Sequence, residues 1–320
     1  MLEPAAITVW HYVGFIVVIL LFLSLDLGVF HKHAHVVKVR EALLWTTLWF
    51  GLAMAFGLGL GLARSREEAL LFITGYILEL TLSMDNVFVM ALIFGYFQVP
   101  VIHQHRVLFW GILGALVMRG LMIGLGAIMI AEAHWILYVF GGFLIYSGIK
   151  MASRHEEGVH PEKNPVVRLA RKFFPIAPQF DGQEFITYKY GGTKLTPLAL
   201  VLVMVETTDL VFALDSIPAI FGVTQEPYLV FTSNVFAILG LRSLYFVLAG
   251  AINYFRYLKF GLSVVLVYIG VKMLAAKWMT IPFGVSLGII LTIILVSMLA
   301  SVIAARREKR AAPTRRPGGP

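Results

Sequence analysis

Residues 71–95 read LFITGYILELTLSMDNVFVMALIFG, an apolar run that carries two carboxylates near its middle. A helix of about 20 apolar residues is long enough to cross the hydrocarbon core of a bilayer. Glu79 and Asp85 therefore lie at membrane depth, where an ionised carboxylate costs about 3 kcal/mol or more. Acidic residues in such positions usually face an inner cavity and serve a function. The run predicts a membrane-spanning helix with a functional polar face.

The whole chain has the composition of a membrane protein. Of its 320 residues, 59% are hydrophobic and 14% are charged, with a mean hydropathy of +0.84. Soluble domains carry about 45–50% apolar and about 25% charged residues. The chain has no Cys, which excludes disulfides, thiolate metal ligands and Cys nucleophiles. The net charge of +8 comes from basic residues between apolar runs, a pattern that indicates membrane topology and no nucleic-acid partner.

Nine apolar runs are long enough to cross a membrane, so we expect an all-α, polytopic transmembrane bundle of about nine helices. The runs cover residues 10–30, 42–62, 71–95, 107–130, 135–152, 197–221, 229–252, 259–275 and 282–304. With the N-terminus outside, nineteen Lys and Arg residues fall in inside connections and three fall in outside connections. This distribution follows the positive-inside rule and predicts a cytoplasmic C-terminus.

The two halves of the chain resemble each other in several patches that occur in the same order. Glu79 recurs as Glu206, and Ile-Phe-Gly at 93–95 recurs at 220–222. Further matches pair Ile-Leu-Gly at 112–114 with 238–240, and Tyr146, Gly148, Lys150 and Met151 with Tyr268, Gly270, Lys272 and Met273. Each copy holds three spans, an odd number, so the copies cross the membrane in opposite directions. Inverted repeats of this kind are typical of secondary transporters.

These features divide the chain into six segments. They are two N-terminal helices (1–70), a first three-helix repeat (71–152), a cytoplasmic linker (153–196), a second, inverted three-helix repeat (197–275), a C-terminal transmembrane helix (276–305) and a basic cytoplasmic tail (306–320). Within the linker we expect a short amphipathic helix near residues 163–174. The tail is expected to be disordered and held near anionic lipid.

Polar residues form matching stripes in the third and sixth spans. At about 100° per residue, Glu79, Ser83 and Asn86 share one helical face. The same spacing places Glu206, Asp209 and Ser216 on one face of the sixth span. Asp85 and Asp215 lie off these stripes and join them only where the helix is locally distorted. Pro218 supplies a cause, because it removes a hydrogen bond to the Leu214 carbonyl.

Carboxylate, amide and hydroxyl oxygens favour hard divalent cations such as Mg²⁺, Ca²⁺ or Mn²⁺. The predicted ligands are Glu79, Asp85, Asn86, Asp209, Asp215 and Ser216, with supporting roles for Ser83, Glu206, Pro218, Arg119, Arg242 and Asn234. We interpret Met84 as a packing residue rather than a soft ligand. Arg119 and Arg242 lie in mid-span and can neutralise two of the five acids. Glu206 either pairs with Arg242 or carries protons.

At these residues the sequence resembles the TerC family of integral membrane proteins. Residues 79–88 resemble its first signature, residues 209–219 resemble its second, and residues 232–242 (TSNVFAILGLR) extend the likeness. The resemblance covers roughly residues 10–305 and is strongest to the Alx branch. It implies manganese export across the bacterial cytoplasmic membrane, and an association of the wider family with tellurite resistance.

We therefore expect a secondary transporter rather than an enzyme, with Mn²⁺ as cargo, no resident cofactor, and proton antiport driven by metal displacing protons. The lipid bilayer and the divalent metal are the expected partners, and a homo-oligomer is compatible with these features.

The alternatives are export of another divalent cation such as Ca²⁺, a tellurite-resistance membrane component, and a scaffold that hands metal on without transporting it. An intramembrane aspartyl protease is less favoured, because its Gly-x-Gly-Asp pattern is missing. The histidines at 31–35 are interpreted as part of a solvated loop.

Overall fold

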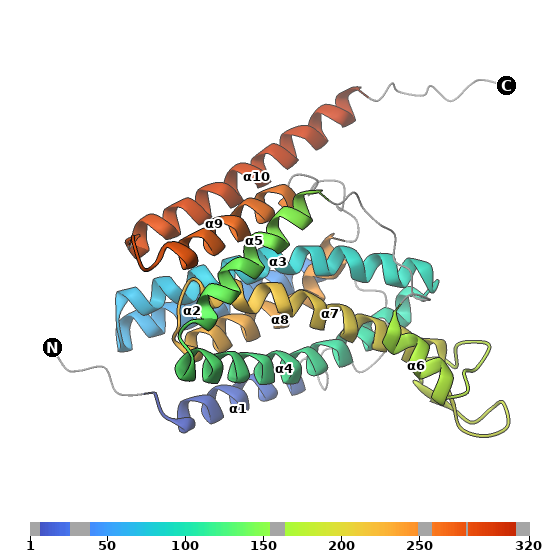
Figure 1. Cartoon of the computed structure of the whole chain (residues 1–320). Helices are drawn as coiled ribbons and strands as arrows, with labels where there is room; N and C mark the ends of the chain where they lie inside the picture. The colour runs from blue at the N-terminus through green and yellow to red at the C-terminus, as the bar shows by residue number, and fades with distance from the viewer. Residues whose placement is uncertain (1–6, 26–38, 154–163, 249–257, 280, 312–320) are drawn as a thin grey trace. The chain divides into compact units, whose positions relative to one another are not determined.

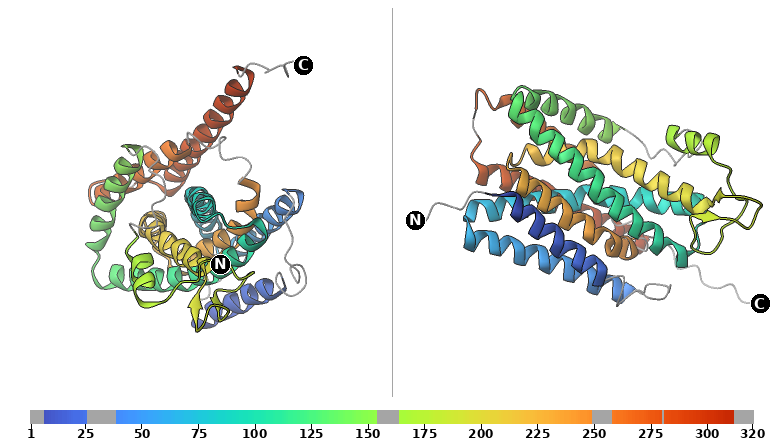
Figure 2. Two further views of the ribbon diagram at one scale, coloured as in Figure 1. Left: turned by 90° about the vertical axis from the view of Figure 1, so that its right-hand side faces the viewer. Right: turned by 90° about the horizontal axis from the view of Figure 1, so that it is seen from below.

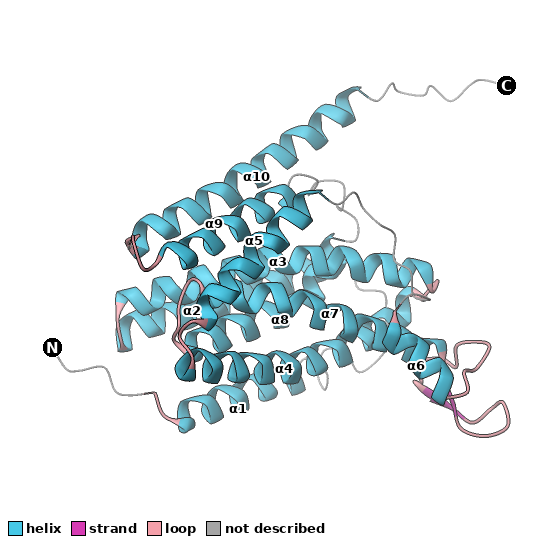
Figure 3. Cartoon of the chain, viewed as in Figure 1, coloured by secondary structure: helices cyan, strands magenta, loops and turns pink. Residues whose placement is uncertain are grey.

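The computed structural model describes residues 7–25, 39–153, 164–248, 258–279 and 281–311 (Figure 1). The described part of the chain is predominantly helical and contains a single pair of short strands (Figure 3). The elements are α1 (Val9–Leu25), α2 (Val39–Ala63), α3 (Arg66–Tyr96), α4 (Val101–Glu132), α5 (Ile136–Ser153), α6 (Pro165–Phe173), β1 (Ile186–Thr187), β2 (Lys194–Leu195), α7 (Pro197–Phe221), α8 (Pro227–Leu248), α9 (Leu258–Ala275) and α10 (Phe283–Ala311). The all-α prediction is confirmed.

Eight of the nine predicted spans correspond to helices that are long and apolar enough to cross a membrane. Helix α1 covers the predicted first span through Leu25, and residues 26–30 of that span lie outside the described residues. Helix α10 continues to Ala311, so part of the predicted disordered tail is helical instead. The short amphipathic helix expected in the linker is confirmed as α6. The histidines at 31–35 lie outside the described residues.

Local sequence signals explain where the central helices begin. The side chain of Ser65 accepts a hydrogen bond from the backbone N–H of Glu68, and Glu67 and Glu68 place negative charge at the positive end of α3. Thr196 caps α7 in the same way, and Pro197 follows at the first helical position. These caps fix the starts of the two helices that carry the predicted acidic stripes.

The described helices divide into two compact units, and one of them contains α1–α4 and α6–α8. Within this unit α3 packs along α8 and α7 packs along α4, while α2 lies against both α3 and α8 (Figure 2). Aromatic residues fill the contact between these helices: the rings of Phe56, Phe72 and Phe236 lie 5.0–5.8 Å apart. The predicted acidic stripes therefore lie within a single packed unit.

Helices α3 and α7 run in opposite directions through this unit. Arg64, just before α3, lies within electrostatic range of Glu226, just before α8. At the other end, Arg106 near the start of α4 pairs with Glu184, which precedes α7 in the chain, at 3.4 Å. The start of α3 is therefore near the end of α7, and the end of α3 is near the start of α7. These directions agree with an inverted repeat.

The second unit contains α5, α9 and α10. Helices α5 and α9 approach closely where small residues meet. A Cβ atom added to Gly270 would lie 2.5 Å from the Gly141 carbonyl oxygen, and one added to Gly148 would lie 2.7 Å from the Ser263 carbonyl oxygen. The repeat that matches Gly148 with Gly270 also matches Gly141 with Ser263 at the same spacing. The crossing is therefore formed twice by equivalent residues of the two copies.

We expect Gly270→Ala to lower the free energy of unfolding by about 1–3 kcal/mol, because the new methyl group would overlap backbone atoms that cannot move aside. Thermal unfolding of the purified protein in detergent measures this loss. Gly142→Ala on α5 is the matched control, since a Cβ there meets nothing within 4 Å. Equal melting temperatures for the two variants would contradict the close crossing.

Candidate functional site

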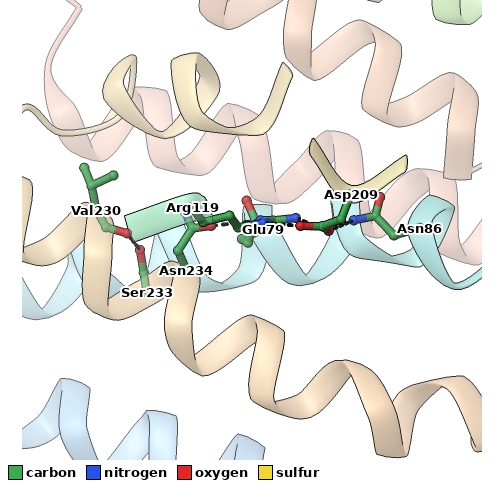
Figure 4. A network of polar contacts seen from close by, with 7 residues as sticks. All are labelled: Glu79, Asn86, Arg119, Asp209, Val230, Ser233 and Asn234. Carbon is green, nitrogen blue, oxygen red and sulfur yellow. Dashed lines mark hydrogen bonds and ion pairs between the residues drawn. The ribbon is translucent and has the colours of Figure 1, made fainter. Parts of the chain in front are cut away.

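Three of the predicted site residues meet at one arginine, Arg119 of α4 (Figure 4). Its Nε donates to Asp209 Oδ2 at 3.1 Å and its Nη2 donates to Asp209 Oδ1 at 2.9 Å, a bidentate pair. Its Nη1 pairs with Glu79 and donates to Asn234 Oδ1 at 2.8 Å. Asn86 Nδ2 donates to Asp209 Oδ1 at 3.2 Å. Four helices, α3, α4, α7 and α8, thus contribute one connected polar network.

This network is removed from solvent. Glu79 is 0% exposed, Arg119 is 2% exposed and Asp209 is 4% exposed. Charges in such a place are stable only when they are paired and hydrogen-bonded. One guanidinium facing two carboxylates leaves one formal negative charge. The pairs with Arg119 therefore do not by themselves balance the charge of both carboxylates.

Several polar atoms around the network have no hydrogen-bond partner. Among the described residues they are Glu79 Oε2, Ser83 Oγ, Asn86 Oδ1, Glu206 Oε2, Ser216 Oγ and Asn234 Nδ2. Buried polar groups in folded proteins are nearly always paired with protein, water or an ion. Five of these six atoms are oxygens of the kinds that bind hard cations.

Glu206 occupies a different environment from its repeat partner Glu79. Its carboxyl group lies against Gly114 of α4, where an added Cβ atom would overlap the carboxylate. The expected ion pair with Arg242 does not form among the described residues. Gly114 is therefore a site residue that the sequence argument did not identify. Gly114 belongs to the repeated Ile-Leu-Gly motif, so the sequence does mark it as a matched position. The motif does not predict which side chain packs against this glycine.

The remaining predicted residues lie on the same helices as the network, α3, α7 and α8. Helices α3 and α7 continue past Asp85 and Pro218, and the local distortion that would bring Asp85 and Asp215 onto the polar stripes stays a prediction. Asp85 and Asp215 are partly exposed. Arg242 is buried, and with Asp209 it lines a cavity of ≈ 10 Å³, room for about one water molecule.

The predicted ligands are not gathered into a metal cluster in this arrangement. Within the described part of the chain, no three His, Asp or Glu side chains are grouped as metal ligands. The guanidinium of Arg119 instead lies between Glu79 and Asp209. The structure thus describes the two acids in an arginine-bound state, and metal binding by these residues stays a prediction.

Comparison with known protein families matches residues 64–309 to the integral membrane protein TerC family. The chain belongs to the TerC family. The matched range contains every residue of the Arg119 network, so the network is part of the TerC portion of the chain. The family resemblance inferred from the acidic motifs is confirmed.

The chain is similar to other TerC-related bacterial proteins over most of its length. It is 51% identical over 278 residues to an uncharacterized membrane protein of Myxococcus xanthus, covering 87% of each chain. It is 44% identical over 285 residues to an Escherichia coli K12 protein with the provisional name membrane-bound redox modulator Alx, covering 86% of this chain and 89% of that one. No solved structure matches the chain.

We expect Arg119→Gln to lower the free energy of unfolding of this TerC protein by about 3–5 kcal/mol, because it leaves Glu79 and Asp209 buried without their cation. Arg106→Gln is the control. It removes an ion pair with Glu184 that is largely exposed and contributes about 0–1 kcal/mol. Thermal unfolding in detergent compares the two variants, and equal losses would show that the buried pairs contribute little.

Proposed function

We propose that this TerC protein exports Mn²⁺ across the bacterial cytoplasmic membrane in exchange for protons. We further propose that its N-terminus lies outside and its C-terminus lies in the cytoplasm, as the distribution of Lys and Arg favours. The family assignment and the membrane-spanning helices support a transporter-like role. The metal, the direction and the coupling ion belong to the proposal.

The observation that carries the proposal is the position of Arg119 between acids of the two repeats. A guanidinium held by Glu79 and Asp209 lies where a mobile cation would find two carboxylates together. The unpaired oxygens of Ser83 and Asn86 lie on the same face of α3 and can complete an oxygen shell. Metal binding then requires Arg119 to move away from the acids.

Charge balance connects this exchange to protons. Arg119 neutralises one of the two carboxylates, so a proton neutralises the other in the arginine-bound state. A divalent cation neutralises both carboxylates, and its arrival therefore releases that proton. The displaced guanidinium then needs a new anion. Glu206 of α7, whose carboxyl group lies against Gly114 of α4, becomes that anion by losing its own proton, so that binding of one divalent cation releases two protons in all.

Manganese is favoured over other metals by the family resemblance, while the oxygen ligands also suit Ca²⁺ and Mg²⁺. The redox role in the name of the Escherichia coli relative belongs to that protein. This chain has no Cys, so thiol–disulfide exchange is not available to it. An export function needs no thiol, because the proposed ligands are all oxygen atoms.

Flux measurements in proteoliposomes test the proposal. We expect metal-driven transport with Mn²⁺ and coupled acidification of the compartment that the metal does not enter, recorded alongside Ca²⁺ and Mg²⁺. Asp209→Asn and Asp85→Asn are expected to abolish transport while the protein remains inserted, and Arg106→Gln is expected to keep it. Wild-type rates in the Asp209→Asn variant would remove the network from the mechanism. Metal binding without flux would instead support a metal-handing scaffold.

A second variant tests the role of Glu206 separately. We expect Gly114→Ala to reduce transport at least tenfold, because the methyl group displaces the Glu206 carboxyl group from α4. Gly124→Ala is the matched control on the same helix, since a Cβ there meets nothing within 4 Å. Unchanged flux in the Gly114→Ala variant would show that this position of Glu206 is not needed.

A further inference from the structure

Helix α6 is strongly amphipathic and presents two different exposed faces. At about 100° per residue, Val166, Leu169 and Phe173 fall on one side of the helix. The basic residues Arg168, Arg171 and Lys172 fall on the opposite side, and the helix contains no acidic residue. Val167 lies between the two faces and is fully buried. One narrow edge of α6 therefore packs on the protein, while its apolar and basic faces are open.

Contacts with α7 place α6 close to the membrane surface. Helix α6 packs against α7, beside the start of that helix (Figures 1 and 2). Asn164, the N-cap of α6, donates through Nδ2 to the sulfur of Met204 at 3.3 Å. Met204 lies seven residues inside α7, about 10 Å along its axis. Because α7 is long enough to cross a membrane, its first turns are expected near one membrane surface, and α6 packs beside them.

The apolar face of α6 is not covered by other described parts of the protein. Leu169 is 55% exposed and Phe173 is 66% exposed, and Phe174 directly after the helix is 55% exposed. A helix with Leu and Phe on one face and Lys and Arg on the other is typical of segments that lie in the interface of a bilayer. Each basic residue near an anionic membrane surface raises the ratio of membrane-bound to released helix about fivefold.

We propose that α6 binds the surface of an anionic bilayer. Val166, Leu169 and Phe173 enter the boundary between headgroups and acyl chains, and Arg168, Arg171 and Lys172 contact lipid phosphates. The partner is negatively charged because the exposed charges of α6 are all positive. This binding is independent of the proposed transport function, since it uses none of the residues around Arg119.

The absence of Cys from the chain makes a direct test simple. Leu169→Cys introduces the only thiol, which is labelled with an environment-sensitive nitrobenzoxadiazole fluorophore after purification of the full chain. The protein is then placed in nanodiscs of phosphatidylcholine alone or of phosphatidylcholine mixed with phosphatidylglycerol. We expect brighter, blue-shifted emission in the mixed lipid, which is reversed by high salt. The same label at Arg171→Cys, on the opposite face, is expected to report water in both lipids.

Charge variants complete the test. In the Leu169→Cys background, we combine Arg168→Gln, Arg171→Gln and Lys172→Gln. We expect this triple change to lower the ratio of lipid-bound to released α6 more than a hundredfold. These side chains are exposed, so the helix is expected to stay folded. Water-exposed emission at position 169 in both lipids, or equal burial without phosphatidylglycerol, would overturn the proposal. Protection in detergent that grows with protein concentration would assign the face to a second copy instead.

Discussion

A guanidinium buried with two carboxylates is the constraint on which the rest of the described architecture depends. Moving such charges out of water costs several kcal/mol for each ion, and only close, well-directed pairing compensates for this cost. The bidentate geometry of Arg119 and Asp209 needs α4 and α7 at a fixed register, and the pair with Glu79 fixes α3 as well. The packing of α3 on α8 and α7 on α4 maintains these registers.

The glycines of α4 affect both the packing of α7 against α4 and the position of a charged side chain. Gly111 allows Val205 to approach α4, and Gly114 allows the Glu206 carboxyl group to lie on the helix surface. Small residues permit close helix approach in membranes, where lipid tails offer no hydrophobic force to bring helices together. In α4 they have a second consequence, since they bring an acidic side chain of α7 onto the helix that carries Arg119.

Much of the site could be predicted from the sequence because helical periodicity is a local property. The stripes grouped Glu79 with Asn86, which the Arg119 network connects, and the apolar run at 197–221 placed Glu206 and Asp209 inside a predicted span. The double pairing of Arg119 could not be predicted, because it depends on which helices become neighbours. The local distortion at Asp85 and Pro218 stays a prediction: α7 runs on past Pro218, which has no backbone N–H to donate to the Leu214 carbonyl.

The two repeats place the equivalent acids Glu79 and Glu206 in different surroundings. Under the proposed function, this difference bears on how the transporter changes access. Glu79 is bound to Arg119, whereas its repeat partner Glu206 lies on Gly114 without an ion pair. The repeat partner of Gly114 is Gly240, which lies beside Trp49 rather than beside an acid. Inverted-repeat transporters change access when the two copies exchange conformations around one site. Under the proposed function, transfer of the Arg119 guanidinium from Glu79 to Glu206 is the exchange between the copies that would accompany the change of access.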